Sequence, residues 1–225
     1  MDMRARLSEA VTRLNADDGV RVMVLTGAGP AFSAGVDLAE SRDVVRSGDA
    51  LLSTPVAAPL EQFEKPILAA INGPAVGAGL ELALAADLRI ASSKARFALP
   101  EVKIGSLPGS GGTQRLMRLM PAAVAAKAIF TGEPFDAADA LRYGLVSDVC
   151  PPEELTELAT RIAGAIVSAA PLSVRAAKIA VTAALSGVSG HALERALWGM
   201  LSMTADRQEG RAAFRERRPP KFTGT

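Results

Sequence analysis

Hydrophobic residues form two kinds of pattern along most of this chain. Short continuous runs, several of them β-branched, are typical of buried strands, whereas stretches with an apolar residue every three or four positions predict helices. Strands or extended segments are predicted at residues 20–25, 67–71, 88–91, 97–99 and 145–149, and helices at residues 3–16, 79–86, 115–120, 122–130 and 137–143. Strands that alternate with helices predict an α/β fold whose buried strands are mostly parallel.

Beyond Pro151 and Pro152 the predicted elements are all helical. The periodicity predicts helices at residues 153–168, 172–185 and 190–214. The proline pair therefore divides the chain into a core of residues 1–150 and a helical region of residues 151–225. Residues 37–64 are poorly periodic and predict a loop that contains a helix.

Charge and composition narrow the function. Lys and Arg number 25 against 24 Asp and Glu, a net charge of +1, so no basic excess favours nucleic acid or a membrane surface. No apolar run is as long as a membrane span, and the N-terminus has no signal-peptide core. One Cys and one His exclude an internal disulfide and argue against a Cys/His zinc site. We expect a cytoplasmic protein without metal, whose chemistry comes from carboxylates, backbone amides, Lys, Ser or Tyr.

Three glycine-rich stretches are candidates for ligand-binding loops. Residues 27–32 follow a strand, but Phe32 stands where a dinucleotide fingerprint has its third glycine. Residues 109–113 lack the lysine of a P-loop. Residues 72–81 join a strand to a helix, whose first amides are unpaired and suit an anion or an oxyanion. Close packing of that helix on the strand is the alternative explanation for the small residues.

Two glutamates lie beside these stretches. Glu81 lies in the first turn of the helix predicted at residues 79–86, and Glu101 comes 20 residues later in an apolar neighbourhood. Two carboxylates on adjoining elements can activate one water and return its proton. Solvated surface charges are the alternative, and the spacing alone does not decide between the two interpretations.

Several blocks of the sequence resemble the enoyl-CoA hydratase/isomerase, or crotonase, superfamily, in family order over nearly the whole chain. They are AFSAGVDL at 31–38, INGPAVGAGLELA at 71–83, FALPE at 97–101, GSLPGSGGTQRL at 105–116, TGE at 131–133, YGLV at 143–146 and RPPKF at 218–222. The resemblance implies a spiral of ββα units followed by a helical region that builds trimers, which pair into hexamers. It also implies acyl-CoA thioester substrates bound without a metal or redox cofactor.

The resemblance also implies roles for individual residues. The backbone amides of Val36 and Ala78 match the pair that holds the thioester oxygen as it becomes an enolate; the family often has glycine at the second position. Glu81 and Glu101 match the two glutamates of the hydratases, and both being present favours hydration of a trans-2-enoyl-CoA to a 3-hydroxyacyl-CoA. The expected substrate and CoA contacts are Ala34, Val36, Asp37, Leu38, Gly77, Ala78, Gly109 and Lys221, with Gly109 packed beside the second glutamate.

One departure from the family concerns the N-terminus. The family begins with a β-hairpin before its first helix, and this chain begins within that helix, so we expect the hairpin and part of the CoA site to be missing. Two alternatives to a hydratase stay open: another crotonase-fold acyl-CoA enzyme (isomerase, hydrolase or lyase), and a non-catalytic acyl-CoA-binding protein.

The helical region carries a wide apolar face and a basic tail. Leu193, Leu197, Met200 and Leu201 share one face of the predicted helix 190–214. Such a face is either core or a subunit interface, and the resemblance favours the interface. The tail, at Arg217, Arg218 and Lys221, has few nearby acids in the sequence and suits the phosphates of CoA, including a CoA held by a neighbouring subunit.

Overall fold

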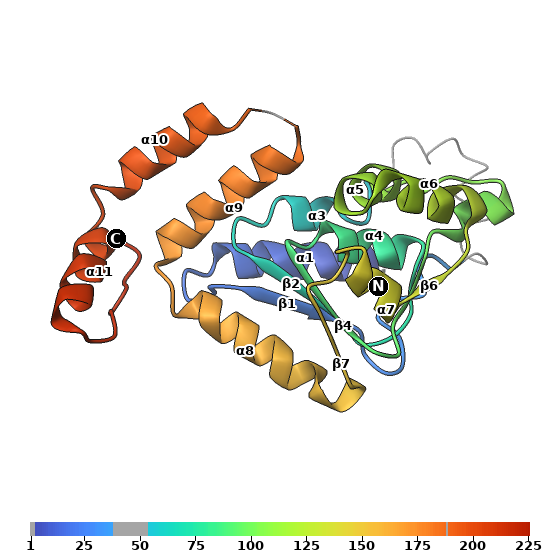
Figure 1. Ribbon diagram of the computed structural model, residues 1–225, viewed down its shortest axis with the longest axis horizontal. Helices are drawn as coiled ribbons and strands as arrows, with labels where there is room; N and C mark the ends of the chain where they lie inside the picture. Colours follow the sequence, from blue (N-terminus) through green and yellow to red (C-terminus); the bar gives the residue numbers. More distant parts are fainter. Residues whose placement is uncertain (1–2, 38–53, 188) are drawn as a thin grey trace.

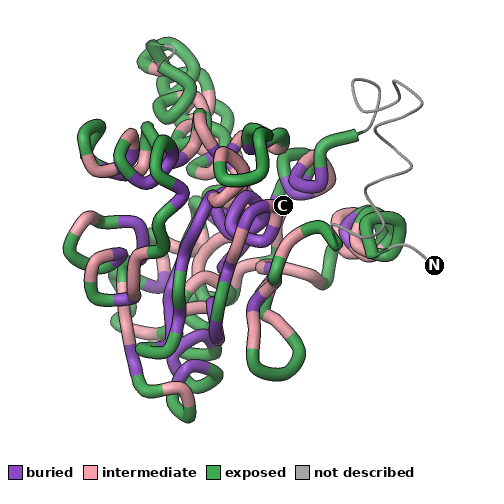
Figure 2. The backbone as a smooth tube through the Cα atoms, turned by 90° about the vertical axis from the view of Figure 1, so that its right-hand side faces the viewer, coloured by how far each residue is buried: buried purple, intermediate pink, exposed green. Residues whose placement is uncertain are grey.

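A four-stranded parallel sheet lies at the centre of the molecule. The computed structural model describes residues 3–37, 54–187 and 189–225. The sheet has the strand order β1-β2-β4-β7, and each neighbouring pair is parallel. The strands are β1 (Met23–Thr26), β2 (Ile67–Ile71), β4 (Leu88–Ser92) and β7 (Asp148–Cys150). Figure 2 shows the buried strands in the middle of the molecule and mostly exposed helices and loops around them.

A second, smaller sheet lies next to the first. Two of its strands, β3 and β5, each follow directly after a strand of the first sheet along the chain. The smaller sheet pairs β3 parallel with β5 and β5 antiparallel with β6. Its strands are β3 (Ala75–Val76), β5 (Arg96–Ala98) and β6 (Phe135–Asp136). A strand of the first sheet is thus followed by a strand of the second and then by a helix, as in β2-β3-α4, which confirms the predicted spiral of ββα units.

Helices surround these sheets. The α-helices are α1 (Met3–Ala16), α3 (Ala58–Glu61), α4 (Ala78–Ala85), α5 (Gly112–Leu119), α6 (Ala122–Thr131), α7 (Ala137–Arg142), α8 (Leu155–Val167), α9 (Pro171–Leu185), α10 (His191–Leu201) and α11 (Ala205–Glu216). A 3-10 turn, Pro100–Ile104, follows β5. The helix predicted within residues 37–64 is α3, and residues 38–53 of that segment lie outside the described part of the chain.

The central strand β2 explains how the layers are held together. All five of its residues are buried. Leu68 and Ala70 pack with the apolar side of α8, whereas Ile67 and Ile71 belong to the larger cluster on the opposite face, together with residues of α1, α3 and α4. Successive side chains of a strand point to opposite faces, so one apolar run supplies both cores. Figure 1 shows α8 on one side of the sheet and α1, α3 and α4 on the other.

Several predicted elements have different bounds in the structure, and two of these differences have a local cause. The strand expected at 145–149 is β7, which begins only at Asp148, because the amides of Leu145 and Val146 both bond to the carbonyl of Ala140 at the end of α7. The helix expected at 190–214 is two helices. Thr204 has an extended backbone, and its hydroxyl accepts a hydrogen bond from the Arg207 amide, so it begins α11 as an N-cap.

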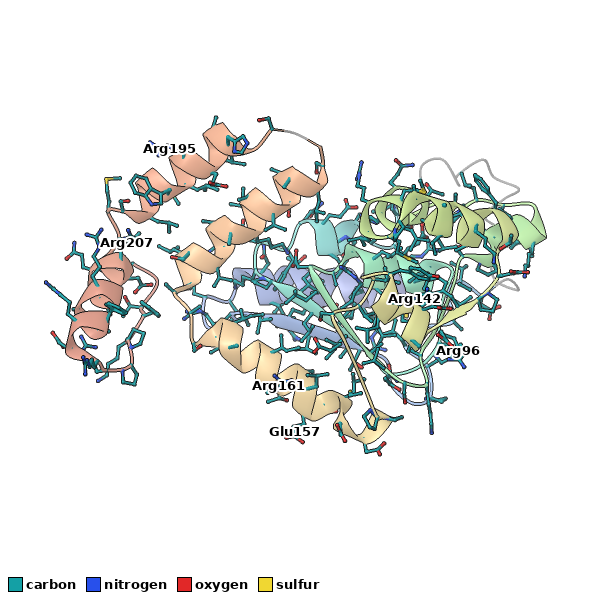
Figure 3. All side chains as sticks on the ribbon, in the orientation of Figure 1. Arg96, Arg142, Glu157, Arg161, Arg195 and Arg207 are labelled. Atoms are coloured by element: carbon teal, nitrogen blue, oxygen red, sulfur yellow. The ribbon has the colours of Figure 1, made fainter. Side chains whose placement is uncertain are left out.

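The last three helices extend away from the sheet. In Figure 1, α9, α10 and α11 form an arm on the side opposite α5 and α6. Arg195 and Arg207 mark α10 and α11 in Figure 3, where Glu157 and Arg161 project from the outer side of α8. Within the described residues no single helix is long and apolar enough to cross a membrane; α8 with its preceding turn and α9 pass that test only as a pair bent by 107°. The division into residues 1–150 and 151–225 stays a prediction.

Candidate active site

Two loops meet where the smaller sheet leads into α4. The Ser33 amide donates to the Pro74 carbonyl at 3.1 Å, and the Val76 amide donates to the Ser33 carbonyl at 3.0 Å. Gly35 has φ +89°, and a Cβ there would lie 2.7 Å from the Val76 carbonyl oxygen. The close approach of these loops therefore requires glycine at position 35.

The two amides expected to form an oxyanion hole lie on these loops. Ala78 is the first residue of α4, so its amide has no partner within the helix. In the described part of the chain, neither the Val36 nor the Ala78 amide donates a hydrogen bond. A Cβ on Gly35, which precedes Val36, would lie 3.4 Å from the Ala78 nitrogen. The structure thus brings two uncommitted donors into one region, at the positive end of a helix dipole.

Three other positions expected to contact CoA lie on these same two loops. Ala34 and Asp37 are exposed on the loop that carries Val36. Gly77 precedes Ala78 and has the left-handed φ of +55°. Leu38 lies outside the described residues. A role in binding stays a prediction for each of them.

Glu81 is a buried carboxylate held in one orientation by a loop. It is 2% exposed, and its Oε1 accepts hydrogen bonds from the Ser110 amide at 2.6 Å and the Gly112 amide at 2.8 Å. A Cβ on Gly112 would lie 3.0 Å from this same oxygen. The GSGG segment therefore serves the carboxylate of α4: its amides hold one oxygen and leave Oε2 available to bind a water or substrate.

Glu101 has the opposite environment. It lies in the 3-10 turn after β5, and its Oε2 is buried without a hydrogen-bond partner within the described residues. Burial raises the pKa of the Glu101 carboxyl, a hydrogen bond from its own backbone amide opposes this, and the negative charge of Glu81 raises the pKa further. A carboxyl with a free oxygen and a raised pKa is suited to proton transfer.

Two glycines, Gly77 and Gly112, lie directly against the two carboxylates. A Cβ on Gly109 would meet nothing within 4 Å, and its expected position beside the second glutamate stays a prediction. A Cβ on Gly77 would instead lie 3.0 Å from Oε1 of Glu101. Gly77 and Gly112 are thus the glycines that make room for Glu101 and Glu81.

Asn72 also shapes the candidate site, a role that the sequence analysis did not assign to it. Its Oδ1 accepts from the Gly27 amide at 3.0 Å, and its Nδ2 donates to the Gly29 carbonyl at 2.9 Å. Asn72 therefore fixes the loop after β1, which leads into the segment carrying Val36. An Asn-Gly-Pro turn directly after a buried strand was the available signal.

The basic tail lies apart from the glutamates in this chain. The end of the chain folds back beside α11, at the opposite end of the molecule from α4 and α5 (Figure 1). Arg218 pairs with Glu209 and Glu216 at 2.6 Å each, so the expectation of few nearby acids is wrong for this residue. The Lys221 amide donates to Glu209 at 2.7 Å. Lys221 is therefore not brought together with the other candidate residues within one chain.

Comparisons with known proteins agree with the resemblance. Residues 1–225 match the family model described as enoyl-CoA hydratase/isomerase. The chain is 48% identical to (E)-benzylidenesuccinyl-CoA hydratase of Thauera aromatica, over 98% of this chain and 88% of that protein. It is 39% identical to crotonyl-CoA hydratase of Syntrophomonas wolfei, over 98% and 87%. A crystal structure of enoyl-CoA hydratase from Bacillus anthracis matches with a TM-score of 0.92 and 39% identity, over 99% of this chain and 88% of the other.

Proposed function

The chain belongs to the enoyl-CoA hydratase/isomerase family, and from this membership and its two glutamates we propose that it adds water to a trans-2-enoyl-CoA to give a 3-hydroxyacyl-CoA. The observation that carries the proposal is the pairing of Glu81, fixed by two backbone amides, with Glu101, whose buried Oε2 has no partner in the described structure. The negative charge of Glu81 contributes to the raised pKa of Glu101, so the two carboxyls are near enough to interact electrostatically.

The proposed reaction needs only acid–base groups. Oε2 of Glu81 accepts a hydrogen bond from the attacking water and orients it. The water oxygen bonds to C3 of the enoyl group as Glu101 takes its proton, and the double-bond electrons move onto the thioester oxygen. Glu101 then delivers a proton to C2, so the enzyme ends in the state in which it began. The reaction requires no metal and no redox cofactor, and CoA is part of the substrate.

Stabilisation of the enolate is assigned to the amides of Val36 and Ala78. Both are backbone donors, so a side chain larger than glycine at either position leaves the donor in place. Loss of one such donor in an enzyme typically costs about 10²–10³ in rate. The unpaired amides at the start of α4 support this assignment.

The names of relatives suggest which substrates to compare. One relative, 40% identical, is named 2,3-dehydroadipyl-CoA hydratase, from Escherichia coli, and the Syntrophomonas wolfei relative is named for crotonyl-CoA. We therefore propose assays with both crotonyl-CoA and 2,3-dehydroadipyl-CoA. Loss of the enoyl-thioester absorbance supports the hydratase, whereas binding without turnover supports an acyl-CoA-binding protein.

We further propose that the protein is a cytoplasmic homotrimer, or a hexamer made from two trimers. The apolar face of α10 supports this assembly, because no described residue of α10 is buried within the chain and Trp198 is 56% exposed. An apolar face left uncovered by its own chain is typical of a subunit interface. Light scattering that shows a monomer would contradict the assembly.

In such an assembly the tail could reach a neighbour's substrate. We propose that Lys221 contacts the CoA phosphates bound by an adjacent subunit. Deleting residues 217–225 should weaken binding of CoA esters and reduce its salt dependence while trimers persist. Unchanged affinity and salt dependence would remove this role from the tail.

A further inference from the structure

The loop that holds Glu81 is itself held by a charged side chain. Nη1 of Arg115 donates a hydrogen bond to the Ser110 carbonyl at 2.7 Å, and Nη2 forms an ion pair with Glu61 of α3. The Arg115 backbone amide also donates to the Gly111 carbonyl at 2.9 Å, as part of the first turn of α5. One residue therefore contacts two successive carbonyls of the loop.

The peptide unit whose carbonyl accepts from Arg115 lies between the two peptide units whose amides bind Glu81. The Ser110 amide belongs to the peptide from residue 109 to 110, and the Gly112 amide belongs to the peptide from 111 to 112. The Ser110 carbonyl belongs to the intervening peptide, from 110 to 111. Because peptide units are planar and rigid, fixing the middle one restricts the rotation of both neighbours. Arg115 thus acts on both donors to Glu81 Oε1.

The guanidinium of Arg115 occupies space that a side chain at position 111 would fill. Gly111 has φ +92°, and a Cβ there would lie 2.3 Å from Nη1 of Arg115. The Arg115 side chain is 20% exposed, compared with 54% for its partner Glu61. On the other side of the loop, the Val56 amide donates to Oγ of Ser110 at 3.0 Å. The loop is therefore clamped from α5 and from the segment before α3.

We propose that Arg115 is a positioning residue for the hydration reaction, acting through the Ser110–Gly112 loop on the orientation of Glu81. The inference rests on the proposed function, because it is Glu81 that orients the water. A displaced carboxylate would still permit substrate binding but would misplace the water, and small misplacements of reacting groups are costly. Glu61 contributes less, since it is half-exposed and its ion pair is screened.

The kinetic test compares Arg115→Met, Arg115→Lys and Arg118→Met with the full chain. Arg118 lies on the same helix, is exposed and has no partner among the described residues, so it is the matched control. We expect Arg115→Met to lower kcat for crotonyl-CoA by about tenfold or more while KM changes less than about threefold. Arg115→Lys should recover part of kcat, because one ammonium can still reach the Ser110 carbonyl, and Arg118→Met should match the unmodified chain.

A second measurement does not depend on activity. Hydrogen exchange of a peptide that contains residues 110–112 should be at least about tenfold faster in Arg115→Met and unchanged in Arg118→Met. If the unmodified chain fails to hydrate crotonyl-CoA, the proposed function is wrong. Unchanged hydrogen exchange in Arg115→Met would separately show that Arg115 does not restrain the loop. If the unmodified chain is active, a kcat within twofold in Arg115→Met, or equal losses in kcat and in substrate affinity, would overturn the positioning role.

Discussion

Glu81 and Glu101 are chemically identical side chains to which we assign different tasks, because their surroundings differ. Glu81 is fixed by two backbone amides, whereas Oε2 of Glu101 is buried with no partner among the described residues. A fixed acceptor suits the orientation of water, and an unpartnered carboxyl with a raised pKa suits proton transfer. The proposed separation of roles therefore rests on the different environments of the two carboxyls.

Replacing either glutamate by glutamine should remove most of the activity. We expect Glu81→Gln and Glu101→Gln each to lower kcat by about 10²-fold or more, since each group contributes to proton transfer or water placement. Affinity for an acyl-CoA, measured by calorimetry, should stay within a few-fold. The double variant should be little slower than the worse single variant, because the two groups act as a unit. Near-normal turnover in either single variant is incompatible with the mechanism.

The raised pKa of Glu101 also predicts how stability depends on pH. The folded protein holds this proton more tightly than the unfolded chain does, so the carboxyl's contribution to stability falls as pH rises from its ordinary pKa through the raised value. Glu101→Gln lacks this ionisation. The Tm of Glu101→Gln minus the Tm of the unmodified chain should therefore be more positive at neutral pH than at acidic pH. Exposed Glu133→Gln is the control, and a Tm difference for Glu101→Gln that is independent of pH would refute the assignment.

At this scale the sequence predicted part of the site. It indicated both glutamates, but only the family resemblance, and not their spacing, paired them. It did not indicate that Gly77 and Gly112 pack against the carboxylates, because those contacts join segments far apart in the chain. The clamp made by Asn72 was missed for the same reason.

The beginning of α4 is the element on which the site depends most. Gly77 has φ +55° and ψ −127°, a conformation nearly restricted to glycine, and Glu101 lies against it. We expect Gly77→Ala to cost about 1–3 kcal/mol of unfolding free energy and to lower kcat, because Cβ would displace Glu101.

Gly164→Ala provides the matched control for that substitution. A Cβ at Gly164, an exposed position inside α8, would meet nothing within 4 Å. This variant should be neutral or more stable by about 0.5–1 kcal/mol in chemical denaturation, with unchanged kcat. Equal effects of the two substitutions would show that the backbone conformation at Gly77 carries no special role.

Among the elements, strongly periodic or continuously apolar segments were predicted best. Buried strands such as β2 and β4 agree with their expected ranges. The helix break at Thr204 was missed because residues that favour helices lie on both sides of it, and a single N-cap hydroxyl decides the boundary. The late start of β7 depends on the end of α7, a contact that hydrophobic pattern does not encode.

For the whole molecule, the fold of the tail depends on one buried carboxylate. Asp206 is 3% exposed, and its oxygens accept from the Thr223 amide at 2.7 Å and the Gly224 amide at 2.9 Å. Asp206→Ala leaves these amides without their acceptor and should cost about 1–3 kcal/mol. Limited proteolysis should then cleave the tail faster, whereas exposed Asp18→Ala should change neither stability nor cleavage. A protease-resistant tail in Asp206→Ala would contradict this account.

The most direct test of the central claim is the fate of the substrate in water labelled with heavy oxygen. The full chain is incubated with trans-2-hexenoyl-CoA, whose chain is long enough to be hydrated or isomerised, and the products are identified by mass spectrometry. The account predicts 3-hydroxyhexanoyl-CoA with one labelled oxygen, and almost none of it with Glu101→Gln. An isomerised hexenoyl-CoA of unchanged mass, or bound and unreacted substrate, would contradict it.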